Sequence, residues 1–130
     1  MLQKKNCHGY VISIGSNSDS DRAIQNVKTA FEFLRQKFDP VTFSDIIPTP
    51  AVGMKVDCVF FNAVAGIKTW MKPAQLKSFL KETEKKMGRI PHSEEIIIDL
   101  DVILADGKIV HEDYKNREFI RELIKTISVN

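Results

Sequence analysis

The sequence predicts an α+β protein in which one antiparallel β-sheet carries helices on one face. Short apolar runs rich in β-branched residues alternate with segments whose apolar residues recur at the helical period. In chain order these segments read strand, helix, strand, strand, helix, strand, which is the ferredoxin-like βαββαβ pattern. After this unit, Asp106-Gly107 predicts a tight hairpin, and one more apolar stripe predicts a C-terminal helix.

The first half of the chain supplies three strands and one helix. The strand from Tyr10 to Ile14 runs into Gly15-Ser16-Asn17, which is either a plain turn or a set of N–H groups that face an anion. A second strand from Val41 to Ile47 is expected to stop at Pro48-Thr49-Pro50. A third strand covers Val59 to Lys68. The helix between the first two strands has one apolar stripe, formed by Ile24, Val27, Phe31, Leu34 and Phe38.

The second half begins with a helix that Pro73 opens and Gly88 ends. The run from Ile96 to Leu104 is then expected to be a strand, long enough to lie centrally. Right-handed crossovers would place it beside the first strand. Lys108 to Val110 would return as a short strand. The last helix has an apolar stripe formed by Phe119, Ile120, Leu123, Ile124 and Ile127.

Two carboxylates interrupt the most apolar run. Side chains alternate along a strand, so Asp99 and Asp101 lie on one face and Leu100 on the other. Partial burial of two like charges is costly unless a cation compensates, and hard oxygen ligands suit Mg²⁺. The alternative is that both acids face solvent or pair with lysines on an edge strand, and the run alone favours neither.

Two other polar residues each allow two interpretations. Asn62 interrupts the apolar run of the third strand. It is either a partly exposed polar residue or a buried amide that contacts a ligand. His92 lies in the polar loop before the acidic strand, and a surface position is the simpler interpretation.

Size and charge restrict the possible functions. The chain of 130 residues fits a single domain, 1–130, with 43% hydrophobic and 28% charged residues. A net charge of +2 gives no electrostatic footprint for nucleic acid, and no apolar run is long enough for a membrane span. Cys7 and Cys58 have no zinc spacing, and no apolar leader begins the chain. We therefore expect a cytoplasmic protein with reduced thiols that binds neither nucleic acid nor membrane.

Six short motifs occur in a recognisable order. They are Ile14-Gly15-Ser16-Asn17, Thr49-Pro50-Ala51-Val52-Gly53, Phe60-Phe61-Asn62-Ala63, Glu84 with Gly88-Arg89, Asp99-Leu100-Asp101, and His111 with Lys115-Asn116-Arg117 and Phe119. Together they resemble the hydroxymethyl-dihydropterin pyrophosphokinases of folate synthesis, over about residues 9–120. Each motif is weak alone, but the set is fairly specific because the order and near-spacing agree.

The resemblance implies an Mg²⁺-dependent kinase that transfers pyrophosphate from ATP to 6-hydroxymethyl-7,8-dihydropterin and releases AMP. It implies that Asp99 and Asp101 hold two Mg²⁺ ions, with Arg89 as a mobile catalytic cation near the phosphates. Pterin-binding residues would be Thr49, Pro50, Val52, Phe60, Asn62 and Phe119, with the two Phe rings against the flat heterocycle. Nucleotide-binding residues would be Glu84, His111 and Arg117.

Two cations of the family pattern are absent. Ile96 and Pro91 stand where the family usually has arginines, and the loop between Gly88 and Asp99 is about three residues shorter. Lys55, His92 or Lys115 could substitute. Loss of both cations would make the enzyme slow, or leave a non-catalytic relative that binds pterin or nucleotide. A ferredoxin-like interaction or RNA-binding module is a third possibility, although the aromatic and basic sheet motif of such modules is lacking.

Overall fold

The computed structural model describes residues 7–51 and 58–127. In chain order the elements are β1 (His8–Ser16), α1 (Ser20–Lys37), β2 (Val41–Phe43), β3 (Ile47–Pro50), β4 (Val59–Thr69), α2 (Pro73–Lys86), β5 (Asp99–Ala105), β6 (Lys108–Ile109), α3 (Asp113–Asn116) and α4 (Glu118–Ile127). The strands form one antiparallel sheet of order β2-β4-β1-β5-β6, and β3 also pairs with β4. The predicted βαββαβ core, with the first and fourth predicted strands side by side, is confirmed.

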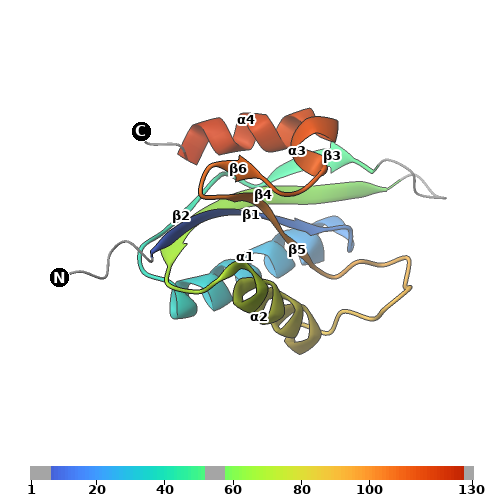
Figure 1. The fold of residues 1–130 in the computed structure, drawn as a ribbon. Helices are drawn as coiled ribbons and strands as arrows, with labels where there is room; N and C mark the ends of the chain where they lie inside the picture. Colours follow the sequence, from blue (N-terminus) through green and yellow to red (C-terminus); the bar gives the residue numbers. More distant parts are fainter. Residues whose placement is uncertain (1–6, 52–57, 128–130) are drawn as a thin grey trace.

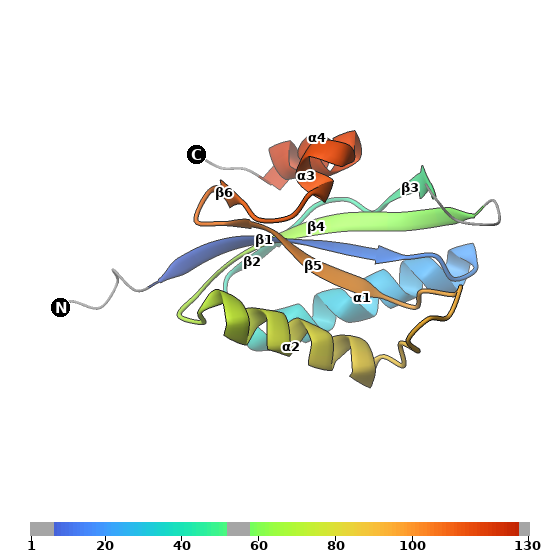
Figure 2. The same ribbon diagram turned by 45° about the vertical axis from the view of Figure 1, so that its right-hand side comes forward.

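Helices α1 and α2 cover one face of the sheet (Figures 1 and 2). Their apolar stripes pack on the strand residues that point to that face, because alternate strand residues share a face. The buried residues of this core include Ile12 and Ile14 of β1, Val27 and Leu34 of α1, and Leu80 of α2. This layer is the one that the sequence predicts.

Helix α4 lies on the opposite face, so the complete chain has helices on both sides of the sheet (Figure 2). A second apolar cluster joins this helix to the sheet through Val64, Ile103, Ile120, Leu123 and Ile127. Polar side chains of β1, β4 and β5 occupy another part of the same face, where they border a cavity. The candidate site therefore lies beside the second core rather than under it.

The predicted second strand is two short strands. Ser44 separates them, because its N–H donates to the Val64 carbonyl at 2.9 Å and its Oγ accepts the Val64 N–H at 2.8 Å. In a regular ladder both bonds would join backbone groups, but here the Ser44 hydroxyl replaces a backbone carbonyl as the acceptor of the Val64 N–H. Pairing resumes at β3, which contains Pro48 and Pro50, so the prediction that strand structure stops at these prolines was wrong. Proline is tolerated there because β3 is an edge strand.

Strand β5 begins at Asp99, three residues later than predicted. The preceding backbone is bonded partly by side chains: the Asn17 Oδ1 accepts the Ile96 N–H at 2.6 Å, and Asn26 Nδ2 donates to the Ile97 carbonyl at 3.1 Å. The Ile96 carbonyl accepts the backbone N–H of Asn17 at 3.0 Å. On the side away from β1, β6 pairs with β5 only at Leu104 and Ala105. The acidic end of β5 consequently lies at an edge of the sheet, not at its centre.

The hairpin and the last connection complete the chain. Asp106 and Gly107 have φ values of 51° and 81°, as the predicted two-residue turn requires. The polar segment before α4, predicted as a connection, contains the single helical turn α3. In the part of the chain that the structure describes, no helix is long and apolar enough to cross a membrane.

Candidate active site

A cavity of about 210 Å³ opens on the face of the sheet that carries α4. Its lining includes seven of the predicted site residues: Thr49, Pro50, Phe60, Asn62, Asp99, Arg117 and Phe119. The sequence assigns Arg117 to the nucleotide, and the structure places it beside the predicted pterin residues. Val52, also predicted to bind pterin, lies outside the described residues.

Asn62 lies in the floor of this cavity and is 9% exposed. Its Nδ2 donates to Thr49 Oγ1 at 2.6 Å, which fixes the amide plane between β4 and β3. The register between β1 and β4 places Gly15 opposite Asn62. A Cβ at position 15 would lie 2.7 Å from Asn62 Oδ1, so only glycine leaves room for the amide in this orientation. Of the two interpretations of Asn62, the buried amide is the one observed.

Two aromatic rings border the same cavity. Phe60 comes from β4 and Phe119 from the start of α4, and both are partly buried. Aromatic faces next to a directional amide suit a flat heterocycle with polar edges.

Asp99 faces the cavity and is held by Arg89. The Arg89 Nη1 donates to Asp99 Oδ1 at 2.9 Å and lies 3.2 Å from Glu84 Oε1. Burial acts to lower the pKa of Arg89, but the hydrogen bond and charge of Asp99, together with Glu84, outweigh it and raise that pKa above its usual value. Arg89 is therefore a charged residue paired with Asp99 and Glu84 at the acidic end of β5, and its role as a mobile catalytic cation remains a prediction.

Glu84 is buried behind this pair, at 4% exposure. Its Oε2 accepts the Leu100 N–H at 2.7 Å, and its Oε1 faces Arg89 and, at 3.5 Å, Lys81 Nζ. Both oxygens are engaged within the protein, so Glu84 positions β5 and Arg89. A direct contact of Glu84 with nucleotide remains a prediction.

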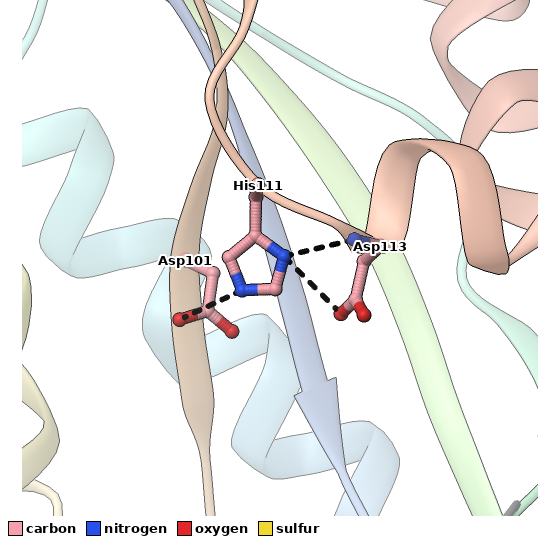
Figure 3. A group of neighbouring side chains, drawn as sticks. All are labelled: Asp101, His111 and Asp113. Atoms are coloured by element: carbon pink, nitrogen blue, oxygen red, sulfur yellow. Dashed lines mark hydrogen bonds and ion pairs between the residues drawn. The ribbon is translucent and has the colours of Figure 1, made fainter.

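Asp101, His111 and Asp113 form a second polar group, shown in Figure 3. One ligand atom of each lies within 4.8 Å of the others. His111 Nδ1 accepts the backbone N–H of Asp113 at 3.0 Å, so the neutral ring carries its proton on Nε2, which lies 3.9 Å from Asp101 Oδ1. His111 is therefore oriented to donate toward Asp101 or toward an anion bound there.

Asp101 is difficult to ionise in this setting. Burial, followed by the charge of Asp99, raises its pKa from 3.8 to about 7, although His111 and Lys81 act in the opposite direction. The two carboxylates repel each other when both are ionised, so the charge of Asp99 disfavours ionisation of Asp101. A bound divalent cation would offset that repulsion, and both acids have oxygen ligands to offer.

A second cavity, of about 470 Å³, lies between β5 and α2. Asp101 and His111 reach it from the sheet side, and Lys77 and Lys81 border it from α2. Its remaining lining is mostly apolar, formed by Pro73, Leu80, Leu100, Val102, Ala105 and Val110. The two predicted metal ligands therefore divide between two cavities, with Asp99 in the first and Asp101 in the second.

Two roles in the site were not predicted from the sequence: that of Asp113, which was not singled out, and that of Asn17, which was named only as part of a turn motif. Asp113 lines the first cavity and accepts from Arg117 Nε at 3.3 Å, and its His-x-Asp spacing from His111 was the available signal. Asn17 holds the loop before β5, with Nδ2 donating to the Glu94 carbonyl at 3.0 Å. No local pattern marks that role, because the two residues are 77 positions apart.

Comparison with known proteins agrees with this geometry. Residues 11–129 match the family described as 7,8-dihydro-6-hydroxymethylpterin-pyrophosphokinase (HPPK). The folate synthesis bifunctional protein of Chlamydia caviae is 31% identical over 134 residues, covering 89% of this chain and 29% of that protein. The 2-amino-4-hydroxy-6-hydroxymethyldihydropteridine pyrophosphokinase of Haemophilus influenzae is 28% identical over 121 residues, covering 84% of this chain and 74% of that protein.

A folic acid synthesis protein of Dictyostelium discoideum is 27% identical over 111 residues, which cover 83% of this chain and 17% of that protein. The chain thus spans less than a third of the length of two of these three relatives. The match to the family covers most of the chain, and the chain belongs to the HPPK family.

Proposed function

We propose that this protein transfers pyrophosphate from ATP to the hydroxymethyl group of 6-hydroxymethyl-7,8-dihydropterin, with release of AMP, as a step of folate synthesis. The observation that carries the proposal is the position of Asp99 and Asp101. Asp99 lines the cavity that contains the Asn62 amide and two aromatic rings. Asp101 lines the cavity that two lysines of α2 border. Family membership and the names of the relatives support the same reaction.

The first cavity suits the pterin. The ring would lie against Phe60 and Phe119, and Asn62 would hydrogen-bond its polar edge. Thr49 and Pro50 would border it from β3. Because Gly15 and Thr49 already fix the Asn62 amide, this hydrogen-bonding group would need no reorientation, which lowers the entropic cost of binding.

The second cavity suits the nucleotide. Its apolar lining would accommodate the base and ribose, while His111 Nε2 and the lysines would face the phosphates. Arg117 and Arg89 would approach the phosphates from the side of the first cavity. A reaction that consumes ATP also favours the cytoplasmic location that the sequence predicts.

Two Mg²⁺ ions held by Asp99 and Asp101 would complete the site. The oxygen donors and the raised pKa of Asp101 fit a divalent cation, because such an ion lets both acids ionise. When bound, Mg²⁺ neutralises charge on the transferred and leaving phosphates.

The residues of the chain contribute mainly position and charge. The pterin hydroxymethyl oxygen forms a bond to the β-phosphorus, the bond from that phosphorus to the bridging oxygen of AMP breaks, and AMP keeps the electron pair. The alcohol proton leaves to solvent. Asn62 and the two rings would orient the attacking oxygen, and Arg89 would stabilise the developing charge.

A binding protein without catalysis is the second candidate. Ile96, where the family has a cation, lines the first cavity, and Pro91 is exposed. Neither position supplies a positive charge to the phosphates, which is the observation that favours this alternative.

Formation of AMP from ATP tests the reaction, measured with and without the reduced hydroxymethylpterin. We expect AMP only when the pterin and Mg²⁺ are both present, and loss of activity in Asp99→Ala and Asp101→Ala with the fold retained. Asp45→Ala, an exposed acid between β2 and β3, is the matched control and should keep full activity. Binding of both ligands without AMP would support the binding protein and reject the enzyme.

A further inference from the structure

We propose that Lys77 and Lys81 of α2 bind the phosphate chain of the nucleotide and supply the positive charge that the loop before β5 does not provide. This inference rests on the proposed function, and it adds two residues that the sequence motifs do not contain. It concerns the second cavity, between α2 and β5.

Besides the two proposed Mg²⁺ ions, the arginines near the two cavities are the obvious cations for a triphosphate, but both are already paired with carboxylates of the protein. Asp99, Asp101 and Asp113 already bring negative charge to the two cavities, and a triphosphate adds more. Arg89 is paired with Asp99 at 2.9 Å, and Arg117 Nε is paired with Asp113 at 3.3 Å. These two cations therefore first offset carboxylates of the protein itself.

The other substitutes considered from the sequence are poorly placed. His92 and Lys115 are both exposed, and neither lines either of the two cavities. Lys55 lies outside the described residues.

Lys77 and Lys81 are well placed for this role. They are four residues apart on α2, so they lie on one helix face, and both border the cavity that contains Asp101 and His111. Lys81 also has a carboxylate partner, but its Nζ lies 3.5 Å from Glu84 Oε1, an oxygen that Arg89 already approaches at 3.2 Å. Because the Lys81 contact is longer and its side chain is more exposed, Lys81 is held less firmly than Arg89. Lys77 makes no ion pair with any residue in 7–51 or 58–127, so its ammonium is available to an anion.

The two lysines have different tasks because α2 runs along β5 (Figure 2). Lys81 is nearer the end of α2 that carries Glu84, and on this proposal it would face the negative charge that develops on the leaving AMP. Lys77 is one turn nearer Pro73, farther along α2 from Glu84, and borders the same cavity. Lys81 is therefore expected to affect both kcat and the KM for ATP, and Lys77 the KM alone.

Steady-state kinetics of the Lys77→Gln, Lys81→Gln and Lys81→Arg variants test this inference. Each Gln variant should raise the KM for ATP about tenfold, as expected for loss of one charge-assisted hydrogen bond, and Lys81→Gln should also lower kcat. Lys81→Arg should restore most of the loss. Lys85→Gln, exposed on the same helix and outside the cavity, is the matched control and should behave as wild type.

Wild-type KM and kcat in both Gln variants would overturn the inference while the proposed reaction stands. If the wild-type protein forms no AMP, the proposed reaction is rejected. The role of the lysines is then tested by measuring the Kd for Mg²⁺–ATP of the wild type and the Gln variants by calorimetry. A Kd raised about tenfold by Lys81→Gln then supports the inference, and an unchanged Kd overturns it.

Discussion

Gly15 illustrates how one atom at the residue scale can determine the shape of a site. An added Cβ would lie 2.7 Å from Asn62 Oδ1, too close for either group to stay in place. We expect Gly15→Ala to turn the Asn62 amide and raise the KM for the pterin about tenfold, the usual loss for one well-placed hydrogen bond. The Kd for Mg²⁺–ATP should change little, because the proposal places most of that ligand in the other cavity.

Gly9→Ala is the matched control, on the same strand. A Cβ at position 9 meets nothing within 4 Å. We expect it to leave both substrates unaffected. Equal effects of Gly9→Ala and Gly15→Ala on the pterin KM would show that β1 needs its glycines for another reason.

Asp101 should destabilise the metal-free fold above neutral pH. Its pKa is raised to about 7 by folding, first by burial and then by Asp99, so between about pH 4 and pH 7 the folded state binds more protons than the unfolded state. The free energy of unfolding therefore falls as pH rises through this window. Asp101→Asn should raise it by roughly 1–3 kcal/mol at pH 8 and by much less at pH 4.

Denaturant unfolding of chelator-treated protein at the two pH values measures this effect. Asp45→Asn changes an exposed carboxylate and serves as the control. A stabilisation by Asp101→Asn that is equal at pH 4 and pH 8 would rule out the carboxylate's ionisation as its cause.

The sequence predicts which residues form the site better than it predicts how they are arranged. The motif order brought Asn62, Asp99 and Phe119 together in one hypothesis, and all three line one cavity. The contact between Gly15 and Asn62 could not be predicted, because it depends on the register of two strands far apart in the sequence. The burial of Glu84 could not be predicted either, since a charged helix residue normally faces solvent.

At the scale of elements, the loop before β5 is held by the end of β1. Asn17 contributes two side-chain hydrogen bonds, to the Ile96 N–H at 2.6 Å and the Glu94 carbonyl at 3.0 Å. We expect Asn17→Ala to lower the free energy of unfolding by about 1–2 kcal/mol and to speed hydrogen exchange at the Ile96 amide.

Gln25→Ala, on an exposed position of α1, should do neither. Exchange at Ile96 that is unchanged by Asn17→Ala would mean that other contacts fix this loop. Hydrogen exchange followed by mass spectrometry or NMR resolves the two outcomes.

Element boundaries departed from prediction where side chains replace backbone partners. Ser44 divides β2 from β3, and Asn17 with Asn26 delays the start of β5. Apolar periodicity gives no information about such bonds, because it reports which residues are buried and not how their backbone is satisfied. The hairpin at Asp106-Gly107 was predictable because a two-residue turn of this kind needs positive φ at both positions, which this residue pair favours.

For the whole molecule, the candidate site extends around the acidic end of β5, with one cavity on the α4 face and the second between β5 and α2. One face of the sheet is covered by α1 and α2, and the other carries α4 beside the first cavity (Figures 1 and 2). Because these cavities exist only in the folded protein, ligand binding should stabilise the whole domain. A non-hydrolysable ATP analogue with Mg²⁺, at about a hundred times its Kd, should raise the free energy of unfolding by about 2.7 kcal/mol.

Thermal unfolding with and without the ligand measures this linkage. Asp99→Ala should lose the Mg²⁺-dependent increase while its ligand-free transition stays cooperative. An increase of the same size in Asp99→Ala and wild type would place the nucleotide away from β5.

A crystal structure with the ATP analogue, Mg²⁺ and the reduced pterin tests the central claim most directly. We predict the pterin between Phe60 and Phe119, with its edge about 3 Å from the Asn62 amide, and the phosphates spanning from Asp99 to Asp101 toward α2. A pterin bound elsewhere, or phosphates that contact neither acid, would contradict the account.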